Sequence, residues 1–145
     1  MNVYELIAKE EGFRERPYLC SEGYPTVGYG QRIGPLWADL SMYEITIPEP
    51  VAKLLLQHKV QKIADRLANE SFYLQCNCAR AAALISMAYQ IGVSGLLKFR
   101  KMIAAIENND WDSAAREALD SRWAVQTPER AKRHSEILRT GVIND

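Results

Sequence analysis

The chain has 145 residues, 18 Lys and Arg against 18 Asp and Glu, and 48% apolar residues. This length fits one domain, or two small lobes that share a core, and the composition excludes a disordered chain and a fibre. The zero net charge removes the simplest argument for a protein that binds nucleic acid. No apolar run approaches the ~20 residues of a membrane span. The charged N-terminus does not look like a secretion signal, so we expect synthesis in a cytoplasm without membrane insertion.

The first predicted element is a helix over about 3–11. Asn2 and Glu5 stand in the positions of a capping box, and Gly12 supplies the stop. Residues 13–34 then favour a small antiparallel sheet of two or three strands, because β-forming residues flank a turn-forming cluster.

Three glycines interrupt the second part of this sheet, at positions where backbone or a ligand can approach closely: Gly28, Gly30 and Gly34. Residues 35–45 read as an irregular connector. Trp37 lies in this connector. Two interpretations of Trp37 stay open, exposure to solvent and stacking against a sugar, and the sequence alone gives no support for the stacking.

A long helix is predicted over about 46–68, with Thr46 and Glu49 as a second capping box. Its length suits a connection between two lobes. The rest of the chain reads as helical. A buried helix is expected over 78–91, and Gly95 is expected to break the chain before the next one.

Further helices are expected over 98–107 and after Asp110, and Thr127 is expected to cap a last helix that ends at Gly141. Trp111 and Trp123 are expected to anchor the core of this helical part.

Acid, thiol and hydroxyl side chains follow one another at the junction of the first helix and the sheet. Glu11 ends the helix, Cys20 follows after eight intervening residues, and Thr26 after five more. Glycoside hydrolysis needs an acid on one side of the scissile bond and a base or nucleophile on the other. The odd number of cysteines, with Cys76 and Cys78 far along the chain, does not indicate disulfides, and we expect no metal site and no cofactor.

Three segments together resemble one family. Residues 11–30, E-G-F-R-E-R-P-Y-L-C-S-E-G-Y-P-T-V-G-Y-G, are similar to the phage-type lysozymes of glycoside hydrolase family 24, especially the T-even-phage branch. Residues 83–92 and 121–133, with R-T-G at 139–141, match in the expected order.

The resemblance implies an α+β, mostly α, two-lobed fold with a small antiparallel sheet, a long connecting helix and a helical C-terminal lobe. It implies one lysozyme domain over 1–145. In this domain the N-terminal helix covers 1–12, the β lobe about 13–45, the connecting helix about 46–68 and the helical lobe about 69–145.

The resemblance also implies a function. The family hydrolyses the β-1,4 bond between N-acetylmuramic acid and N-acetylglucosamine in peptidoglycan. By position, Glu11 is the general acid. Cys20 helps to activate or place the attacking water or stabilises developing positive charge, and Thr26 holds that water from the far side of the sugar. Arg130 is the expected ion-pair partner of Glu11. The expected substrate-binding residues are Gly30, Gln90, Gln126 and Thr127.

The sequence departs from the T-even pattern at several points. Cys20 replaces the commoner Asp, and Gln31 stands where His is usual. The connector is shorter, and the chain is neutral where many relatives are basic.

Two alternatives remain open, a lytic transglycosylase, in which the 6-hydroxyl of N-acetylmuramic acid attacks the anomeric carbon in place of water and forms an anhydro sugar, and a non-catalytic peptidoglycan-binding protein. For Cys20, a packing role with Glu11 acting alone is also open. The family resemblance further implies a monomer that binds peptidoglycan and no nucleic acid. It would be made in a host cytoplasm and reach the periplasmic wall after a holin opens the inner membrane.

Overall fold

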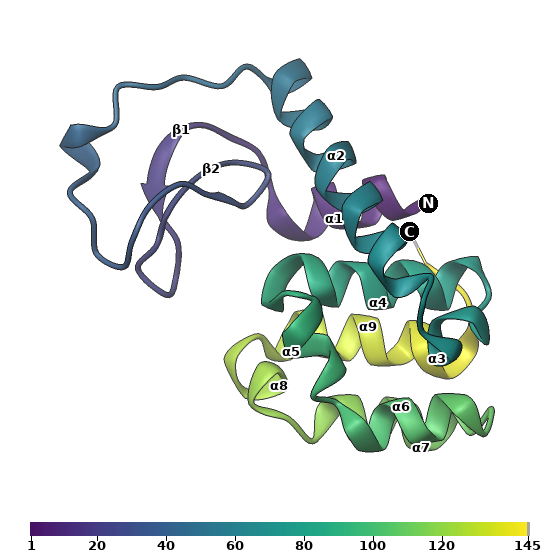
Figure 1. Cartoon of the computed structure of the whole chain (residues 1–145). Coiled ribbons are helices and arrows are strands. Elements are labelled where there is room, and N and C mark those ends of the chain that lie inside the picture. Colours follow the sequence, from purple (N-terminus) through teal and green to yellow (C-terminus); the bar gives the residue numbers. More distant parts are fainter. Residues whose placement is uncertain (145) are drawn as a thin grey trace. The chain divides into compact units, whose positions relative to one another are not determined.

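The computed structural model describes residues 1–144, which form two compact units. One unit, here called the sheet unit, comprises Ile7–Lys59, and the other, the helical unit, joins Met1–Leu6 to the chain from Val60 onward. Two helices, α1 (Val3–Glu11) and α2 (Glu49–Leu67), begin in one unit and end in the other (Figure 1). Within residues 1–144 the chain has nine α-helices and a three-stranded antiparallel sheet, which confirms the predicted α+β, mostly helical fold.

Helix α1 begins and ends where its sequence predicts. The Glu5 amide donates to Asn2 Oδ1 at 2.9 Å, and the Asn2 amide donates to Glu5 Oε2 at 3.2 Å. This reciprocal pair is a capping box. Gly12 has a φ of +71°, the left-handed conformation that ends helices at this position. Glu11 is therefore fixed as the last helical residue.

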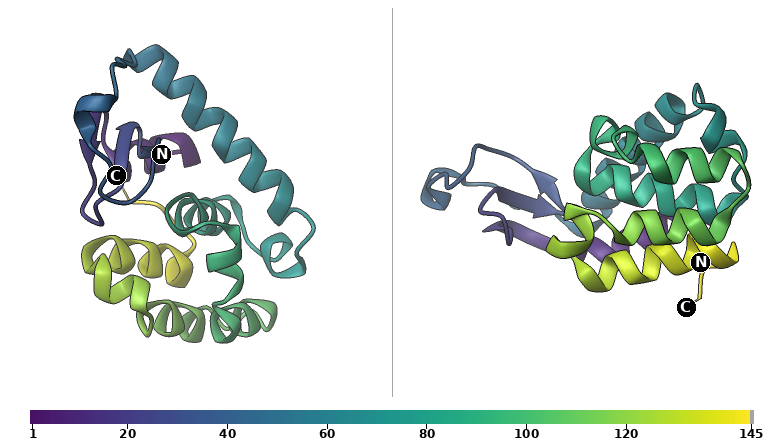
Figure 2. Two further views of the ribbon diagram at one scale, coloured as in Figure 1. Left: turned by 60° about the vertical axis from the view of Figure 1, so that its left-hand side comes forward. Right: turned by 90° about the horizontal axis from the view of Figure 1, so that it is seen from below.

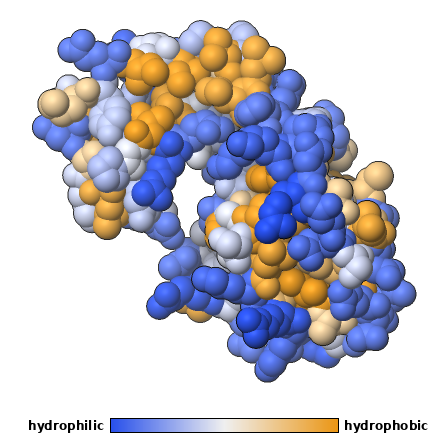
Figure 3. Space-filling model, viewed as in Figure 1, coloured by the Kyte–Doolittle hydropathy of each residue, from blue (hydrophilic) through white to orange (hydrophobic). Residues whose placement is uncertain are grey.

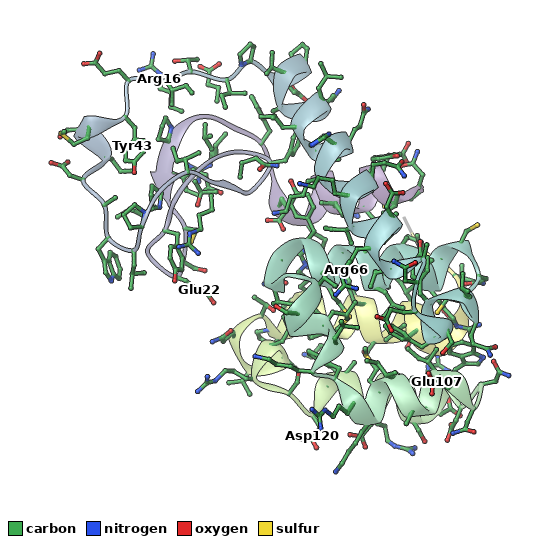
Figure 4. All side chains as sticks on the ribbon, viewed as in Figure 1. Arg16, Glu22, Tyr43, Arg66, Glu107 and Asp120 are labelled. Atoms are coloured by element: carbon green, nitrogen blue, oxygen red, sulfur yellow. The ribbon has the colours of Figure 1, made fainter. Side chains whose placement is uncertain are left out.

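The sheet has the order β1-β2-β3, and both strand pairs are antiparallel. The strands are β1 (Arg14–Leu19), β2 (Pro25–Gly28) and β3 (Gln31–Arg32). A tight turn joins β1 to β2, in which the Gly23 amide donates to the Cys20 carbonyl at 2.9 Å and Gly23 has a φ of +88°. Figure 4 shows Glu22 at the free end of this hairpin.

The connector after β3 contains one short 3-10 helix, Leu40–Met42, which the sequence did not indicate. The predicted start of the long helix at Thr46 is wrong, because α2 begins at Glu49. Ile47 instead donates its amide to the Glu15 carbonyl at 2.8 Å, and a residue before proline disfavours helical backbone. The Glu49 carboxylate accepts a hydrogen bond from the Tyr29 hydroxyl at 2.8 Å instead of capping the helix.

Apolar side chains also lie on the surface of the sheet unit. Figure 3 shows hydrophobic residues gathered over the first half of α2, where Val51, Leu54 and Leu55 are exposed. The inner face of the same helical segment carries the fully buried Ala52, which supports the sheet. A Cβ atom at Gly28 would lie 3.3 Å from its methyl group.

The helical unit is built around α4 (Cys78–Ile91), whose residues from Ala82 to Tyr89 are all buried. Helix α9 (Pro128–Thr140) packs against α4, α7 and α8, as both views of Figure 2 show. The remaining helices of this unit are α3 (Ser71–Leu74), α5 (Val93–Leu97), α6 (Arg100–Glu107), α7 (Trp111–Leu119) and α8 (Arg122–Gln126).

Two sequence expectations about this unit need correction. Gly95 does not break the chain, because it lies inside α5, with the left-handed Gly92 providing the break before it. Thr127 precedes α9 as predicted, but its hydroxyl donates to the Trp123 carbonyl at 3.0 Å and does not cap the helix. None of the helices within residues 1–144 is both long and apolar enough to cross a membrane.

Candidate active site

The Glu11 carboxylate lies against the turn between β2 and β3. A Cβ atom added to Gly30 in that turn would be 2.6 Å from Glu11 Oε2, and Gly30 has a φ of +69°. Only glycine allows both this conformation and this close approach. The bare backbone of Gly30 therefore borders the Glu11 carboxylate, and its role in substrate binding stays a prediction.

Cys20 and Thr26 meet at one backbone oxygen, the carbonyl of Tyr24. The Cys20 amide donates to this oxygen at 2.9 Å, and the Thr26 hydroxyl donates to it at 2.8 Å. Thr26 is only 4% exposed. Because its proton is used on the carbonyl, the hydroxyl offers its remaining lone pairs and can accept a hydrogen bond from a water molecule.

One face of the sheet collects the side chains of the site. Tyr18 pairs with Thr26, and Thr26 pairs with Arg32, so these three residues form a row across the strands. Directly paired residues point to the same face, and residues two apart along a strand do so as well. Cys20 follows Tyr18 by two residues, and its amide continues the ladder to Tyr24. The thiol, the phenol and the hydroxyl therefore belong to a common face.

Tyr18 is a residue of this site that the sequence analysis did not single out. Burial raises the pKa of its phenol, and the negative charge of Glu11 raises that pKa further. Arg14, whose guanidinium lies 4.6 Å from the ring centroid, opposes the shift. The phenol therefore stays protonated beside the carboxylate. The two-residue spacing to Cys20 was the available signal for Tyr18, because it places both residues on one face of a strand.

The three cysteines have different surroundings. Cys20 is a half-buried free thiol of the sheet unit, whereas Cys76 and Cys78 are free thiols of the helical unit. Burial raises the pKa of Cys76 to about 11, so this thiol stays protonated and unreactive at neutral pH. Among residues 1–144, no cluster of three or more His, Cys, Asp or Glu side chains is arranged to hold a metal ion.

Arg130 belongs to a buried polar cluster of the helical unit. Its Nη2 donates to the Ser86 carbonyl and to Ser86 Oγ, both at 3.0 Å. The Oγ also lies 2.7 Å from Nε2 of the fully buried His134. Burial, followed by the charge of Arg130, lowers the pKa of His134 to about 3. Arg130 is therefore fixed by a serine and a neutral histidine, neither of which the sequence analysis assigned to the site.

Trp123 connects two other predicted residues. Its indole Nε1 donates to Gln90 Oε1 at 2.7 Å, and its carbonyl accepts the hydrogen bond from the Thr127 hydroxyl. Trp123 is 4% exposed, so the prediction of a core position is confirmed, and the residue also orients Gln90. Gln126 is exposed at the end of α8.

The predicted site residues are thus divided between the two units. The sheet unit carries Glu11, Cys20, Thr26 and Gly30, and the helical unit carries Gln90, Gln126, Thr127 and Arg130. The pairing of Arg130 with Glu11 joins residues of different units and stays a prediction.

The fold and the sheet-unit site define a small, mostly helical α+β protein in which a carboxylate at a helix end borders the β2–β3 turn, and a thiol and a hydroxyl lie on one face of the neighbouring hairpin. Such a set of groups suits a glycosidase that uses acid catalysis. The sequence model of the phage lysozyme family matches residues 8–136. The chain therefore belongs to the phage lysozyme family.

Individual relatives agree with this family. The chain is 30% identical to the pre-baseplate central spike protein Gp5 of Enterobacteria phage T4, over 97% of this chain and 28% of that protein. It is 26% identical to the probable T4-type lysozyme 1 of Dictyostelium discoideum, over 99% of this chain and 96% of that protein. It is 27% identical to the peptidoglycan hydrolase gp36 of Pseudomonas phage phiKMV, over 90% of this chain and 14% of that protein. The chain thus spans nearly the whole of one relative and a small part of two others.

Proposed function

We propose that this chain is a peptidoglycan hydrolase that cleaves the β-1,4 bond between N-acetylmuramic acid and N-acetylglucosamine. Family membership and the names of the lysozyme and peptidoglycan hydrolase relatives support the general activity. The observation that carries the chemistry is the position of the Glu11 carboxylate, which lies against the backbone of Gly30 and within electrostatic range of Tyr18. This carboxylate belongs to the same unit as Cys20 and Thr26.

In the proposed reaction, Glu11 is the general acid. Its carboxylic acid form gives a proton to the glycosidic oxygen as the bond to the anomeric carbon breaks. The carboxylate that results lies near the protonated phenol of Tyr18, a neutral hydrogen-bond donor. Tyr18 is therefore proposed as a positioning residue for Glu11, because the two side chains interact electrostatically within the sheet unit.

The attacking water is proposed to lie on the sheet face. The Thr26 hydroxyl donates to the Tyr24 carbonyl, which leaves it able to accept a hydrogen bond from the water. Cys20, on the same hairpin, is the second group proposed to orient that water. The water oxygen forms the new bond to the anomeric carbon and releases a proton to solvent, and Glu11 is then reprotonated.

The helical-unit residues complete the proposal. Arg130 is proposed to pair with Glu11, and Gln90, Gln126 and Thr127 are proposed to bind the glycan. Family membership supports these roles, and within the helical unit Ser86 and Trp123 hold the polar groups of Arg130 and Gln90 in one orientation.

Clearing of permeabilised Gram-negative cells tests this function. The wild type is expected to clear the suspension, and Glu11→Gln, which cannot donate a proton, is expected to lose about 10²-fold or more of the rate. The matched control is Glu22→Gln, which changes an exposed carboxylate at the end of the hairpin and is expected to behave as wild type. Retention of more than about a tenth of the rate by Glu11→Gln would contradict the assignment.

The route to the wall is part of the same proposal. We expect a monomer that is made in a host cytoplasm and acts on the periplasmic wall after a holin opens the inner membrane. Expression in Gram-negative cells tests this route. Cells are expected to lyse only when a holin or a membrane-permeabilising agent is added, and lysis without either would contradict it.

A further inference from the structure

Trp37 is exposed in an unusual backbone conformation. Its side chain is 68% exposed, and its φ is +58°, a left-handed conformation that disfavours residues with a side chain. Within residues 1–144, Asn109 is the other non-glycine residue with a positive φ, and asparagine tolerates this conformation far better than tryptophan. Strained residues of this kind are concentrated at functional sites.

The position of the indole is fixed by the hairpin that carries Cys20. The Trp37 amide donates to the Gly23 carbonyl at 2.8 Å, and the Gly23 amide donates to the Cys20 carbonyl at 2.9 Å. A Cβ atom at Gly23 would lie 2.7 Å from ring carbons of Trp37, so the ring rests directly on the bare backbone of the turn. A short chain of backbone hydrogen bonds therefore links the indole to the proposed water-binding residue.

The other aromatic rings of this hairpin are covered. The Arg14 guanidinium lies 4.6 Å from the ring centroid of Tyr18, and the Arg32 guanidinium lies 3.8 Å from that of Tyr24. Trp37 is the ring of this group that presents most of its surface to solvent. An exposed, rigid indole beside a site is a surface on which a ligand with an apolar face can stack.

We propose that Trp37 is a sugar-binding platform on which one pyranose ring of an amino-sugar chain stacks. The faces of a β-1,4-linked pyranose carry axial C–H groups with partial positive charge, and the face of an indole carries partial negative charge. The platform orients the glycan strand next to Cys20 and Thr26. This inference rests on the proposed function, because it names how that site holds its substrate.

The test compares binding and turnover in matched variants. Binding to insoluble peptidoglycan is measured by sedimentation with Glu11→Gln, in which the glycan stays intact, with and without Trp37→Ala. Turnover on soluble glycan fragments gives kcat and KM for the variants that keep Glu11. Met42→Ala is the control, because it removes another exposed apolar side chain of the same connector, 79% exposed in the protein.

Trp37→Ala is expected to weaken binding and raise KM about tenfold, with kcat changed much less, since one aromatic contact is lost. Trp37→Tyr is expected to recover part of the affinity. Trp37→Asn separates binding from folding, because asparagine accepts the left-handed backbone, so its melting temperature should equal or exceed that of the wild type while binding falls. Met42→Ala is expected to bind as the wild type does.

Unchanged binding and KM in Trp37→Ala, in a wild type that hydrolyses peptidoglycan, would overturn the platform and leave the proposed function standing. Concentration-dependent dimers that Trp37→Ala abolishes without a change in glycan binding would also overturn it, in favour of a contact with a second copy. A wild type that binds glycan on Trp37 but does not hydrolyse it would contradict the proposed function alone.

Discussion

A thiol is a weak hydrogen-bond acceptor, so replacing Cys20 separates a chemical role from a packing role. Cys20→Asp is expected to keep the lytic rate, because a carboxylate accepts hydrogen bonds from water with a full charge. Cys20→Ala is expected to lose about 10²-fold, the range for one acid–base group. The initial rate of peptidoglycan clearing measures both variants. Cys78→Ala, an exposed thiol of the helical unit, is the control, and a wild-type rate in Cys20→Ala would show that the thiol only packs.

Gly30 and Gly12 form a matched pair that isolates the contact with Glu11, the proposed catalytic acid. Their φ values are +69° and +71°, but an added Cβ at Gly30 meets Glu11 whereas one at Gly12 meets nothing within 4 Å. Both alanine variants are expected to lose about 1–2 kcal/mol of stability from left-handed strain. Only Gly30→Ala is expected to lose most of its lytic activity, because it displaces the carboxylate. Chemical denaturation and the clearing assay measure the two effects, and equal activities would refute this role of Gly30.

At the scale of elements, the C-terminal end of α9 is held by one residue of α4. Arg80 donates from Nε to the Leu138 carbonyl at 2.8 Å and from Nη2 to the Arg139 carbonyl at 3.1 Å. Its guanidinium also lies 3.9 Å from the ring centroid of Trp111. Because lysine cannot reproduce this planar fork, Arg80→Lys is expected to lose about 1–3 kcal/mol of the free energy of unfolding.

The control for this cap is Arg116→Lys, which changes an exposed arginine whose Nη2 donates to Ser113 Oγ at 2.8 Å, within its own helix. Its stability is expected to stay within about 0.5 kcal/mol of the wild type. Urea denaturation distinguishes the two variants. Equal midpoints would show that the helix end does not depend on Arg80.

Elements governed by local chemistry were predictable from the sequence. The capping box of Asn2 and Glu5 and the stop at Gly12 depend on neighbouring residues alone, and the structure confirms them. The capping box predicted at Thr46 failed because a distant contact intervened. The amide of Ile47 bonds to β1, and this pairing keeps the chain extended until Pro48.

The same contrast between local and distant interactions explains which features of the candidate site could be predicted. The spacing of Glu11, Cys20 and Thr26 could be read from the sequence, because the family motif is local. The role of Tyr18 depends on strand register, and the support of Arg130 by Ser86 depends on the packing of α9 against α4. The left-handed backbone of Trp37 depends on a hydrogen bond to a turn fourteen residues earlier in the chain, so no local pattern indicates it.

For the whole molecule, the buried His134 makes stability depend on pH. Its pKa is lowered to about 3 in the folded state, chiefly by burial, whereas an unfolded histidine titrates near ~6.5. Between these values the unfolded state binds more protons, so the free energy of unfolding falls as the pH falls. The contribution of His134 to the free energy of unfolding is constant above the pKa of the unfolded histidine. It is lost progressively as the pH falls towards the pKa of about 3 in the folded state.

Thermal melting from about pH 8 to about pH 4 measures this dependence. The wild type is expected to lose stability towards acid, and His134→Gln, which cannot be protonated, is expected to show a shallower fall. His58→Gln changes an exposed histidine of α2 and is expected to keep the wild-type slope. If the slope of melting temperature against pH does not respond to the His134 substitution, other groups control the loss of stability at low pH.

Analysis of the sugar ends released from purified peptidoglycan tests the central claim of Glu11-dependent hydrolysis most directly. Digestion in heavy-oxygen water, followed by immediate borohydride reduction and mass spectrometry, is expected to give fragments that end in reduced N-acetylmuramic acid carrying one heavy oxygen. A no-enzyme incubation of reducing fragments corrects for exchange, and Glu11→Gln is expected to release almost none. Fragments that end in anhydro sugar without heavy oxygen would contradict hydrolysis and identify a lytic transglycosylase, and the absence of any cleaved glycan would identify a binding protein.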